Sequence, residues 1–310
     1  MQAIRIHHFG DLDSLVVEDV PRPTPGQGEV LLRVKAAGVG PWDALIRSGH
    51  SVLPQPLPLT LGSDVSGVVE ELGAGVSQFQ VGDAVFGATN GRFTGGYAEY
   101  AVAAAAKLAK KPHRLGFIEA ASVPVVACTA WQMVFEHGAV DSTKRVLVHG
   151  AAGNVGAYAV QLAKRVAREV IATTPSSGLT YVRSLGVDHV IDVQTSRFEE
   201  GLTDVDVVLD TIGGDTQDRS FTVLKPGGVL VSAVSEPDLQ KAARHGARAL
   251  FFLVDVSSRR LEQLAALIQA GELTTNTGDV LSLADARLAH EMLAGRPHKR
   301  GKIVLRVDRS

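Results

Sequence analysis

The chain carries, from Arg145 to Lys164, the stretch RVLVHGAAGNVGAYAVQLAK. Its opening run, residues 146–148, is apolar and is typical of a buried parallel strand. Gly150, Gly153 and Gly156 follow, and beyond them apolar residues recur at helical spacing. A strand, a glycine turn and a helix in this order are the context in which a dinucleotide-binding fingerprint is expected.

Such a turn suits a pyrophosphate for two physical reasons. The N-terminus of a helix offers free N–H groups and the positive end of a dipole, and glycines let the backbone approach the phosphates closely. The usual G-x-G-x-x-G pattern departs at its first glycine, where this chain has alanine. We predict a nucleotide site; the alternative is a glycine-rich turn that binds no ligand. The predicted contacts are Ala152, Gly153, Asn154, Val155 and Gly156.

Composition narrows the class of protein. The 310 residues are 45% hydrophobic, which suits one or two globular domains. The net charge of -2 gives no basic surface for nucleic acid, and the single cysteine, Cys128, excludes a disulfide framework and a cysteine-rich zinc site. The opening residues lack the apolar core of a signal peptide, and no apolar run is long enough to cross a bilayer. We therefore expect a soluble, cytoplasmic protein with no nucleic-acid or membrane partner.

Two kinds of pattern divide the chain. Residues 1–122 contain short alternating strands separated by glycines, which predicts a partly open β-barrel. Residues 123–256 alternate helical patterns with apolar strands, which predicts a doubly wound parallel sheet with helices on both faces. Residues 257–310 are expected to return to the first domain through a strand at 302–307, and Ser282 with Asp285 forms a predicted capping box. The predicted strands of the sheet are 146–148, 170–173, 189–193, 205–211, 228–234 and 250–256.

Several motifs together resemble one family over nearly the whole chain. They are Pro25-Gly26-Gln27-Gly28-Glu29-Val30-Leu31, Leu61-Gly62-Ser63-Asp64, Val81-Gly82-Asp83-Ala84-Val85-Phe86-Gly87, Gly95-Gly96-Tyr97-Ala98-Glu99-Tyr100, the glycine turn, Leu224-Lys225-Pro226-Gly227-Gly228 and Arg300-Gly301-Lys302-Ile303-Val304-Leu305. The set resembles the zinc-free medium-chain dehydrogenases/reductases, in their quinone oxidoreductase (zeta-crystallin-like) branch. The resemblance implies an α/β protein with a GroES-like catalytic domain (1–122 and 257–310) and a Rossmann NADP-binding domain (123–256). It also implies a homodimer, in which the apolar strand at 250–256 would be covered at the sheet edge.

The resemblance also bears on metal binding. Zinc members of the superfamily carry a catalytic cysteine and a Gly-His-Glu segment, whereas this chain has Gly62-Ser63-Asp64 with no ligand set around it. We therefore expect no metal.

The cofactor is predicted from the end of the second strand of the sheet. NAD-specific folds usually have an acidic residue about 20 residues beyond the glycine turn. Here that strand runs into Thr174-Pro175-Ser176-Ser177, with no acid to repel a 2′-phosphate, so the sequence favours NADPH over NADH. Many relatives have a lysine shortly afterwards, where this chain has Gly178. The positive partner would then come from Arg183, Arg300 or Lys302.

Further cofactor contacts follow from the resemblance alone. They lie in the helix before the turn and after the later strands of the sheet; for Thr129, the alternative is a role in helix packing. These residues are Thr129, Thr211, Ile212, Val234, Leu253 and Val254.

Two polar residues are catalytic candidates. Relatives often have Asn-Pro-x-Asp, and this chain has Gly40-Pro41-Trp42-Asp43; they often have a Tyr after Arg-Ser-Gly, and this chain has His50. Asp43 and His50 therefore remain as candidates. The alternatives are a helix-capping or structural role for Asp43 and a solvated loop position for His50.

The resemblance implies hydride transfer from NADPH to a quinone or an α,β-unsaturated carbonyl. Negative charge would develop on the acceptor oxygen, where N–H groups and hydroxyls can stabilise it without a metal. Two other readings stay open: an enoyl-thioester reductase, and a low-turnover NADPH-binding or redox-sensing protein.

Overall fold

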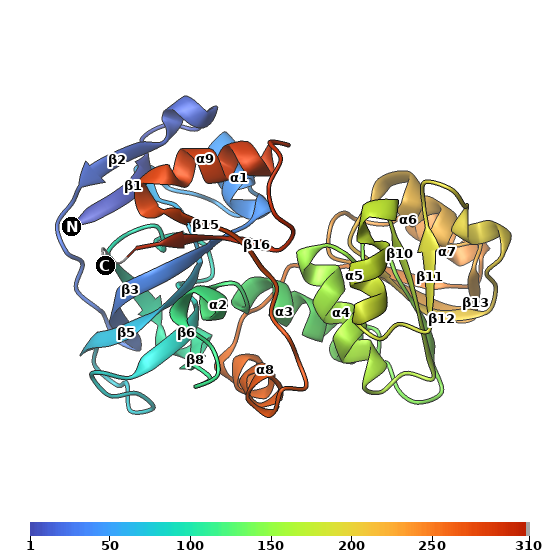
Figure 1. Ribbon diagram of the computed structural model, residues 1–310. Coiled ribbons are helices and arrows are strands. Elements are labelled where there is room, and N and C mark those ends of the chain that lie inside the picture. Colours follow the sequence, from blue (N-terminus) through green and yellow to red (C-terminus); the bar gives the residue numbers. More distant parts are fainter. Residues whose placement is uncertain (308–310) are drawn as a thin grey trace. The chain divides into compact units, whose positions relative to one another are not determined.

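The computed structural model describes residues 1–307, and the chain divides into two compact units. The first comprises Met1–Val125 with the chain from Asp255 onward, and the second is Val126–Val254 (Figure 1). The boundaries expected from the sequence lie two to three residues from these.

Mostly antiparallel strands build the first unit, in which only the β15–β16 pair among the described residues is parallel. A seven-stranded sheet has the order β15-β16-β3-β5-β6-β8, with β7 also paired to β3, and a smaller sheet has the order β2-β1-β4. The strands are β1 (Gln2–Ile6), β2 (Val16–Asp19), β3 (Glu29–Val39), β4 (Leu59–Thr60), β5 (Asp64–Leu72), β6 (Ala84–Ala88), β7 (Tyr100–Ala104), β8 (Leu108–Lys110), β15 (Thr277–Ser282) and β16 (Lys302–Arg306). This arrangement confirms the GroES-like fold.

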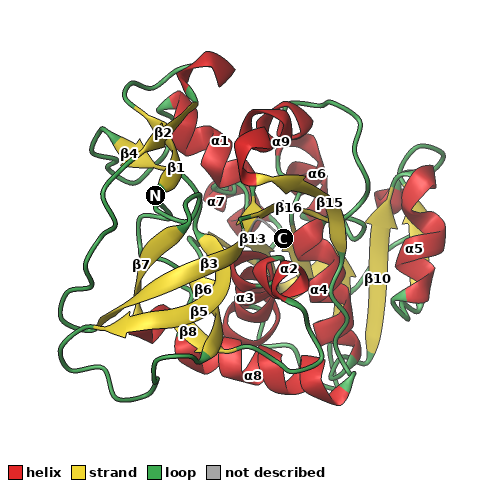
Figure 2. Ribbon diagram, turned by 60° about the vertical axis from the view of Figure 1, so that its left-hand side comes forward, coloured by secondary structure: helices red, strands yellow, loops and turns green. Residues whose placement is uncertain are grey.

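Segments from both ends of the sequence share this unit. β16 runs antiparallel to β3, with Ile303 opposite Val39, as the motif at 302–307 predicts. The predicted capping box is present, because the Asp285 carboxylate accepts from the Ser282 hydroxyl at 2.6 Å, and α9 begins there and packs against β15 (Figure 2). The helices are α1 (Pro41–Ser48), α2 (Phe117–Ala121), α8 (Ser258–Ala270) and α9 (Ala286–Leu293). α3 (Pro124–Trp131) starts at the unit boundary and continues as a π-helical turn, Gln132–His137.

A six-stranded, wholly parallel sheet forms the second unit. Its order is β11-β10-β9-β12-β13-β14, so the chain reverses direction across the sheet between β9 and β12. Figure 1 shows α4 and α5 on one face and α6 and α7 on the other, which confirms the doubly wound fold. The elements are β9 (Arg145–Val148), α4 (Asn154–Lys164), β10 (Glu169–Thr174), α5 (Leu179–Ser184), β11 (His189–Asp192), β12 (Val205–Asp210), α6 (Gly214–Ser220), β13 (Leu224–Ser232), α7 (Leu239–Arg244) and β14 (Arg248–Phe251).

The apolar runs form these strands because both faces of the sheet are covered. In β9 and β12, for example, Leu147, Val148, Val208 and Leu209 are completely buried. Ligands in such sheets bind beyond the carboxyl ends of the strands, at the point where the strand order reverses. The turn that follows β9 is therefore the expected place for a ligand.

Two predicted strands differ from the structure. β13 begins at Leu224 rather than residue 228, because residues 225–228 form an irregularity within the ladder, between the Leu224 and Val229 pairings, with Gly227 at φ 81°. β14 ends at Phe251 rather than residue 256, since its neighbour β13 ends at Ser232 and offers no further partner. Within residues 1–307, no helix combines the length and apolar character needed to cross a membrane.

Candidate functional site

The glycine turn after β9 has the shape that its sequence predicts. Gly150 has φ 70°, and a Cβ atom there would lie 2.4 Å from the Thr211 hydroxyl. At Gly156 a Cβ would lie 2.2 Å from the Gly150 carbonyl oxygen, so this glycine lets α4 pack tightly onto the turn. Side chains at these two positions are therefore excluded by the fold itself.

Gly153 serves a different purpose. It is the N-cap of α4, and a Cβ there would meet only the Gly150 carbonyl oxygen, at 3.2 Å. The first helical hydrogen bond runs from the Ala157 N–H to the Gly153 carbonyl oxygen. The N–H groups of Asn154, Val155 and Gly156 precede that bond, so they can receive an anion at the end of an eleven-residue helix.

A cavity of about 400 Å³ opens beside this turn, wholly within the second unit. It is bordered by segments that follow β9, β10, β11 and β12, so it lies at the carboxyl edge of the sheet, next to the point of reversal. Its size is in the range of small-molecule sites. The lining residues are Gly150, Thr173, Thr174, Pro175, Val193, Ser196, Arg197, Phe198, Ile212, Asp215, Thr216 and Arg219.

The structure brings only some of the predicted contacts to this cavity. Thr174 and Ile212 line it, and Thr211 closes the turn by donating its hydroxyl to the His149 carbonyl oxygen at 2.7 Å. Thr129 is buried in α3. Val234 and Leu253 are about half exposed, and Val254 is partly buried.

Asp210, which belongs to none of the motifs recognised in the sequence, organises two of the loops. Its buried carboxylate accepts the Ile212 and Gly213 N–H groups at 2.9 Å each, and the Ser232 hydroxyl at 3.0 Å. Ser232 in turn accepts the Val234 N–H at 3.2 Å. A buried acid at the end of an apolar strand is a sequence signal that could have revealed this role.

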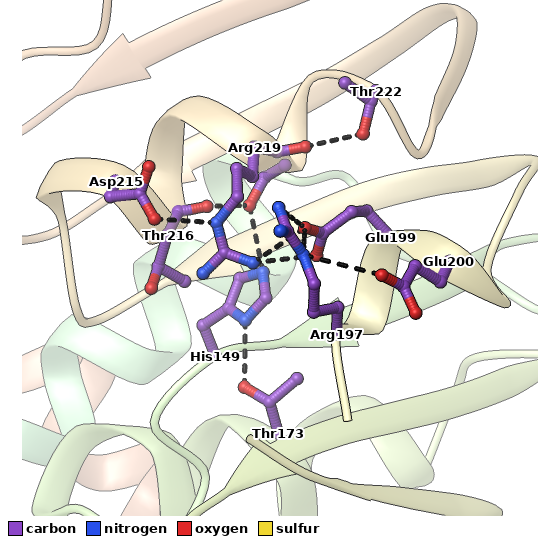
Figure 3. A network of polar contacts seen from close by, with 10 residues as sticks. His149, Thr173, Arg197, Glu199, Glu200, Asp215, Thr216, Arg219 and Thr222 are labelled. Atoms are coloured by element: carbon purple, nitrogen blue, oxygen red, sulfur yellow. Dashed lines mark hydrogen bonds and ion pairs between the residues drawn. The ribbon is translucent and has the colours of Figure 1, made fainter. Parts of the chain in front are cut away.

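His149 lies beneath the turn in a hydrogen-bonded chain (Figure 3). Its Nδ1 lies 2.8 Å from the Thr173 hydroxyl and its Nε2 lies 2.9 Å from the Ser220 hydroxyl. Since the Ser220 proton is donated to the Thr216 carbonyl oxygen, His149 must donate from Nε2 and accept at Nδ1. Burial lowers the pKa of His149 to about 4, so the ring is a neutral structural link between β9, β10 and α6.

Two arginines at the cavity are held by carboxylates (Figure 3). Arg219 pairs with Glu199 at 2.7 Å and with Asp215 at 2.8 Å, and Arg197 pairs with Glu199 at 2.7 Å and Glu200 at 3.7 Å. Burial works to raise the pKa of Glu199, but hydrogen bonds from the backbone and both guanidinium groups lower it to about 2. The charge of each arginine is thus largely balanced within the cluster.

Ser176 and Ser177 form a 3-10 turn that leads into α5, and the side chain of Ser176 has an unexpected partner. Its hydroxyl donates to the carboxylate of Asp192 at 2.5 Å. No acid directly follows the end of β10 in the sequence; this carboxylate comes from the end of the neighbouring strand, β11.

In the first unit, Asp43 is a buried capping residue. Its Oδ2 accepts the Gly40 N–H at 2.8 Å and the Tyr97 hydroxyl at 2.9 Å, which corresponds to the structural alternative. Burial raises the pKa of Asp43 to about 7, and it raises the pKa of Tyr97 well above its ordinary value. His50 is exposed, and its Nδ1 lies 2.9 Å from the Ser48 hydroxyl. Asp43 is completely buried, and its hydrogen-bond partners are Gly40 and Tyr97 rather than His50.

Lys302 does not have the accessibility that its predicted role requires. It is 1% exposed, its ammonium lies 2.9 Å from the Asp64 carboxylate, and the Trp42 ring centroid lies 4.0 Å away. Because that charge is used inside the first unit, the prediction that Lys302 meets a 2′-phosphate is not supported. Arg300 is exposed in the same unit.

Ser63 and Asp64, in the segment that stands in place of the zinc-type Gly-His-Glu motif, contact other residues of the protein. Ser63 accepts the Trp42 indole N–H at 3.1 Å, and Asp64 accepts the Val125 N–H at 3.0 Å in addition to pairing with Lys302. Within residues 1–307, no group of three or more His, Cys, Asp or Glu side chains is arranged to hold a metal ion. Cys128 is buried in α3.

Comparison with known proteins agrees with this geometry. The family described as "Alcohol dehydrogenase GroES-like domain" matches residues 26–113, and that described as "Zinc-binding dehydrogenase" matches residues 185–305. The quinone oxidoreductase of Lama guanicoe is 31% identical over 322 residues, covering 98% of this chain and 97% of the relative. The mitochondrial NAD(P)H oxidoreductase RTN4IP1 of Mus musculus is 32% identical, covering 90% of this chain and 82% of the relative.

Among solved structures, the quinone oxidoreductase from Coxiella burnetii matches with a TM-score of 0.90 at 31% identity, covering 99% of each chain. Sequence and structure thus agree along essentially the full length of both proteins. The chain belongs to the quinone oxidoreductase family of the medium-chain dehydrogenases/reductases.

Proposed function

We propose that this protein is an oxidoreductase that transfers a hydride from a nicotinamide dinucleotide to a quinone or an α,β-unsaturated carbonyl, without a catalytic metal. The observation that carries the proposal is the glycine turn and its cavity at the point of strand reversal. Relatives named quinone oxidoreductases and NAD(P)H oxidoreductases support the same reaction class.

The described residues fit a dinucleotide. The N–H groups of Asn154, Val155 and Gly156 would hold the pyrophosphate, and the cavity bordered by Thr174 and Ile212 would take the adenosine half. The bound cofactor supplies the hydride. The protein's own contribution is to orient the dinucleotide, and the bonds from Asp210 and His149 keep the surrounding loops in place.

Metal independence is supported by what occupies the zinc-type segment. Although one matching family is described as zinc-binding, Ser63 and Asp64 contact Trp42, Lys302 and Val125. Charge on the acceptor oxygen would be stabilised by hydrogen-bond donors, which suffices for a conjugated acceptor. We assign no proton transfer to Asp43, because it is buried and capping α1; His50 remains the exposed candidate.

The sequence and the structure favour different dinucleotides. Ser176 and Ser177 favour NADPH as hydrogen-bond donors, but a 2′-phosphate beside Ser176 would also face Asp192. The homodimer expected from the resemblance would use β14, the edge strand of the parallel sheet, and light scattering after size-exclusion chromatography tests it.

The reaction class is tested by following oxidation of NADH and NADPH against a benzoquinone, a larger quinone, a short enone, an enoyl thioester and a simple ketone. We expect turnover with the quinones or the enone that persists after dialysis against a chelator. Turnover with the simple ketone alone, lost after chelation, would reject the proposal. Thermal stabilisation by a dinucleotide without turnover on any acceptor would instead support a binding protein.

A further inference from the structure

The adenosine ribose has a defined place in this fold. When a pyrophosphate lies on the N-terminus of α4, the ribose reaches the end of the next strand, where an acid in NAD-specific proteins binds its hydroxyl groups. In this chain that strand is β10, which ends at Thr174, and Thr174 lines the cavity. The residues around the end of β10 therefore decide between a free 2′-hydroxyl and a 2′-phosphate.

An acid stands at this place, supplied by the adjacent strand. Asp192 is the direct partner of Thr174 in the parallel ladder of β10 and β11. Its Oδ2 accepts the Ser176 hydroxyl at 2.5 Å and its Oδ1 accepts the Gln194 N–H at 3.0 Å. These two bonds fix the carboxylate at the carboxyl edge of the sheet, and its oxygens keep further lone pairs for a ribose hydroxyl.

The same contacts remove a donor that a 2′-phosphate would need. The Ser176 hydroxyl proton points at Asp192, and the Ser176 N–H donates to the Gln194 side-chain oxygen at 3.1 Å. Both donors of Ser176 are thus already engaged by acceptors of the protein.

The two arginines that line the cavity do not offset the carboxylate, and Arg183, which lines a second cavity together with Asp192, adds only one positive charge. Arg197 and Arg219 line the cavity, but Glu199, Glu200 and Asp215 pair with them. With Asp192 included, four carboxylates accompany two guanidinium groups. A dianionic phosphate would enter a cluster whose formal charge is already negative.

The position after β10 where relatives often have a lysine is also closed. A Cβ atom at Gly178 would lie 2.0 Å from the Thr174 hydroxyl and 2.9 Å from the Cβ of Ala152. No side chain fits at residue 178 without moving the turn.

We infer that Asp192 makes this site selective for NADH over NADPH, by accepting a hydrogen bond from the ribose 2′-hydroxyl and repelling a 2′-phosphate. This specificity rests on the proposed function and reverses the preference that the sequence alone predicts. A carboxylate discriminates in this way because it can only accept hydrogen bonds and because like charges at short range repel.

The test compares the dissociation constants of NADH and NADPH, measured by fluorescence titration at low ionic strength, for the natural protein, Asp192→Asn and Asp204→Asn. Asp204 is a suitable control, since it precedes β12 at the opposite edge of the parallel sheet and its φ of 58° tolerates asparagine. We expect the natural protein to bind NADH at least about tenfold more tightly than NADPH. Asp192→Asn should reduce this ratio at least about tenfold, mainly by improving NADPH binding, and Asp204→Asn should leave it unchanged.

A second measurement needs no variant. Adenosine 2′,5′-bisphosphate should compete with NADH more weakly than adenosine 5′-monophosphate does, because the two molecules differ only in the 2′-phosphate. Equal or tighter binding of NADPH by the natural protein, or an unchanged ratio in Asp192→Asn, would overturn the inference and leave the proposed reaction standing. Failure to bind either dinucleotide would overturn the proposed function itself.

Discussion

The indole ring of Trp42 folds back over Gly40, so that a Cβ atom at residue 40 would lie 2.3 Å from the ring. The same ring covers the ammonium of Lys302, which pairs with Asp64. The departure from the Asn-Pro-x-Asp pattern of relatives thus has a steric reason. The space that a side chain at residue 40 would occupy is filled by the indole two positions later.

Gly40→Ala should therefore destabilise the protein by overpacking. The backbone at residue 40 (φ -134°) accepts alanine, so the expected loss of about 1–3 kcal/mol in the free energy of unfolding comes from the clash alone. Gly91→Ala is the control, because its Cβ would have only one neighbour, at 4.0 Å. Urea unfolding measures the free energy of unfolding of both variants. Equal values would contradict the packing described for Trp42.

The buried carboxyl of Asp43 should make stability depend on pH. Its pKa is raised to about 7 in the folded protein, from 3.8 as the ordinary value, so the folded state holds a proton that the unfolded state releases. Stability from this group is full below about pH 4 and is lost as pH rises to about 7, with a slope of at most about 1.4 kcal/mol per unit. Asp43→Asn keeps an oxygen to accept from Gly40 and Tyr97 but cannot ionise.

Urea unfolding at pH 5, 6 and 7 measures this effect. We expect the free energy of unfolding of Asp43→Asn, relative to that of the natural protein, to increase from pH 5 to 6 and again from pH 6 to 7. Parallel pH profiles for the two proteins would show that Asp43 titrates normally.

Removing one partner of the buried ion pair should be costly. Lys302→Met leaves the carboxylate of Asp64 buried without its cation, and the expected loss is about 3–5 kcal/mol. Lys299→Met removes an exposed lysine from the same segment and should cost less than about 0.5 kcal/mol. If the double variant Asp64→Asn/Lys302→Met is no more stable than Lys302→Met, the pairing does not explain the loss.

Substitutions at two glycines of the turn should have different effects, one on stability and the other on dinucleotide binding. Gly156→Ala brings a Cβ to 2.2 Å from a backbone carbonyl oxygen and should lower stability by more than about 2 kcal/mol. Gly153→Leu places its Cβ 3.2 Å from the same oxygen and should fold, but its side chain would block the pyrophosphate. We expect its dinucleotide dissociation constant to rise more than about tenfold. A change within about threefold would reject the proposed role of the turn.

Features encoded over short stretches of sequence were predictable. The apolar runs and the glycine turn predicted a doubly wound parallel sheet, and the spacing of Ser282 and Asp285 predicted a capping box. Each depends on residues that are close in the chain, so periodicity and motif spacing are sufficient signals.

Features that depend on distant pairing were not predictable in this way. Asp192 reaches Ser176 only because β10 and β11 pair in one particular register, and Lys302 meets Asp64 only because β16 and β5 flank β3. Lys302 was therefore predicted to bind a phosphate when its charge is buried, and Asp192 was overlooked although it pairs with Thr174, which lines the cavity.

The pairing of β16 with β3 also sets an order for assembly during synthesis. Ile303 is made roughly 260 residues after its partner Val39, which at ribosomal rates of about 5–20 residues per second is a delay of more than about ten seconds. The second unit, a continuous stretch from Val126 to Val254, is complete before β16 leaves the ribosome. Until then the edge of β3 at residues 36–39 lacks its neighbour, which makes the nascent chain dependent on protection of that edge.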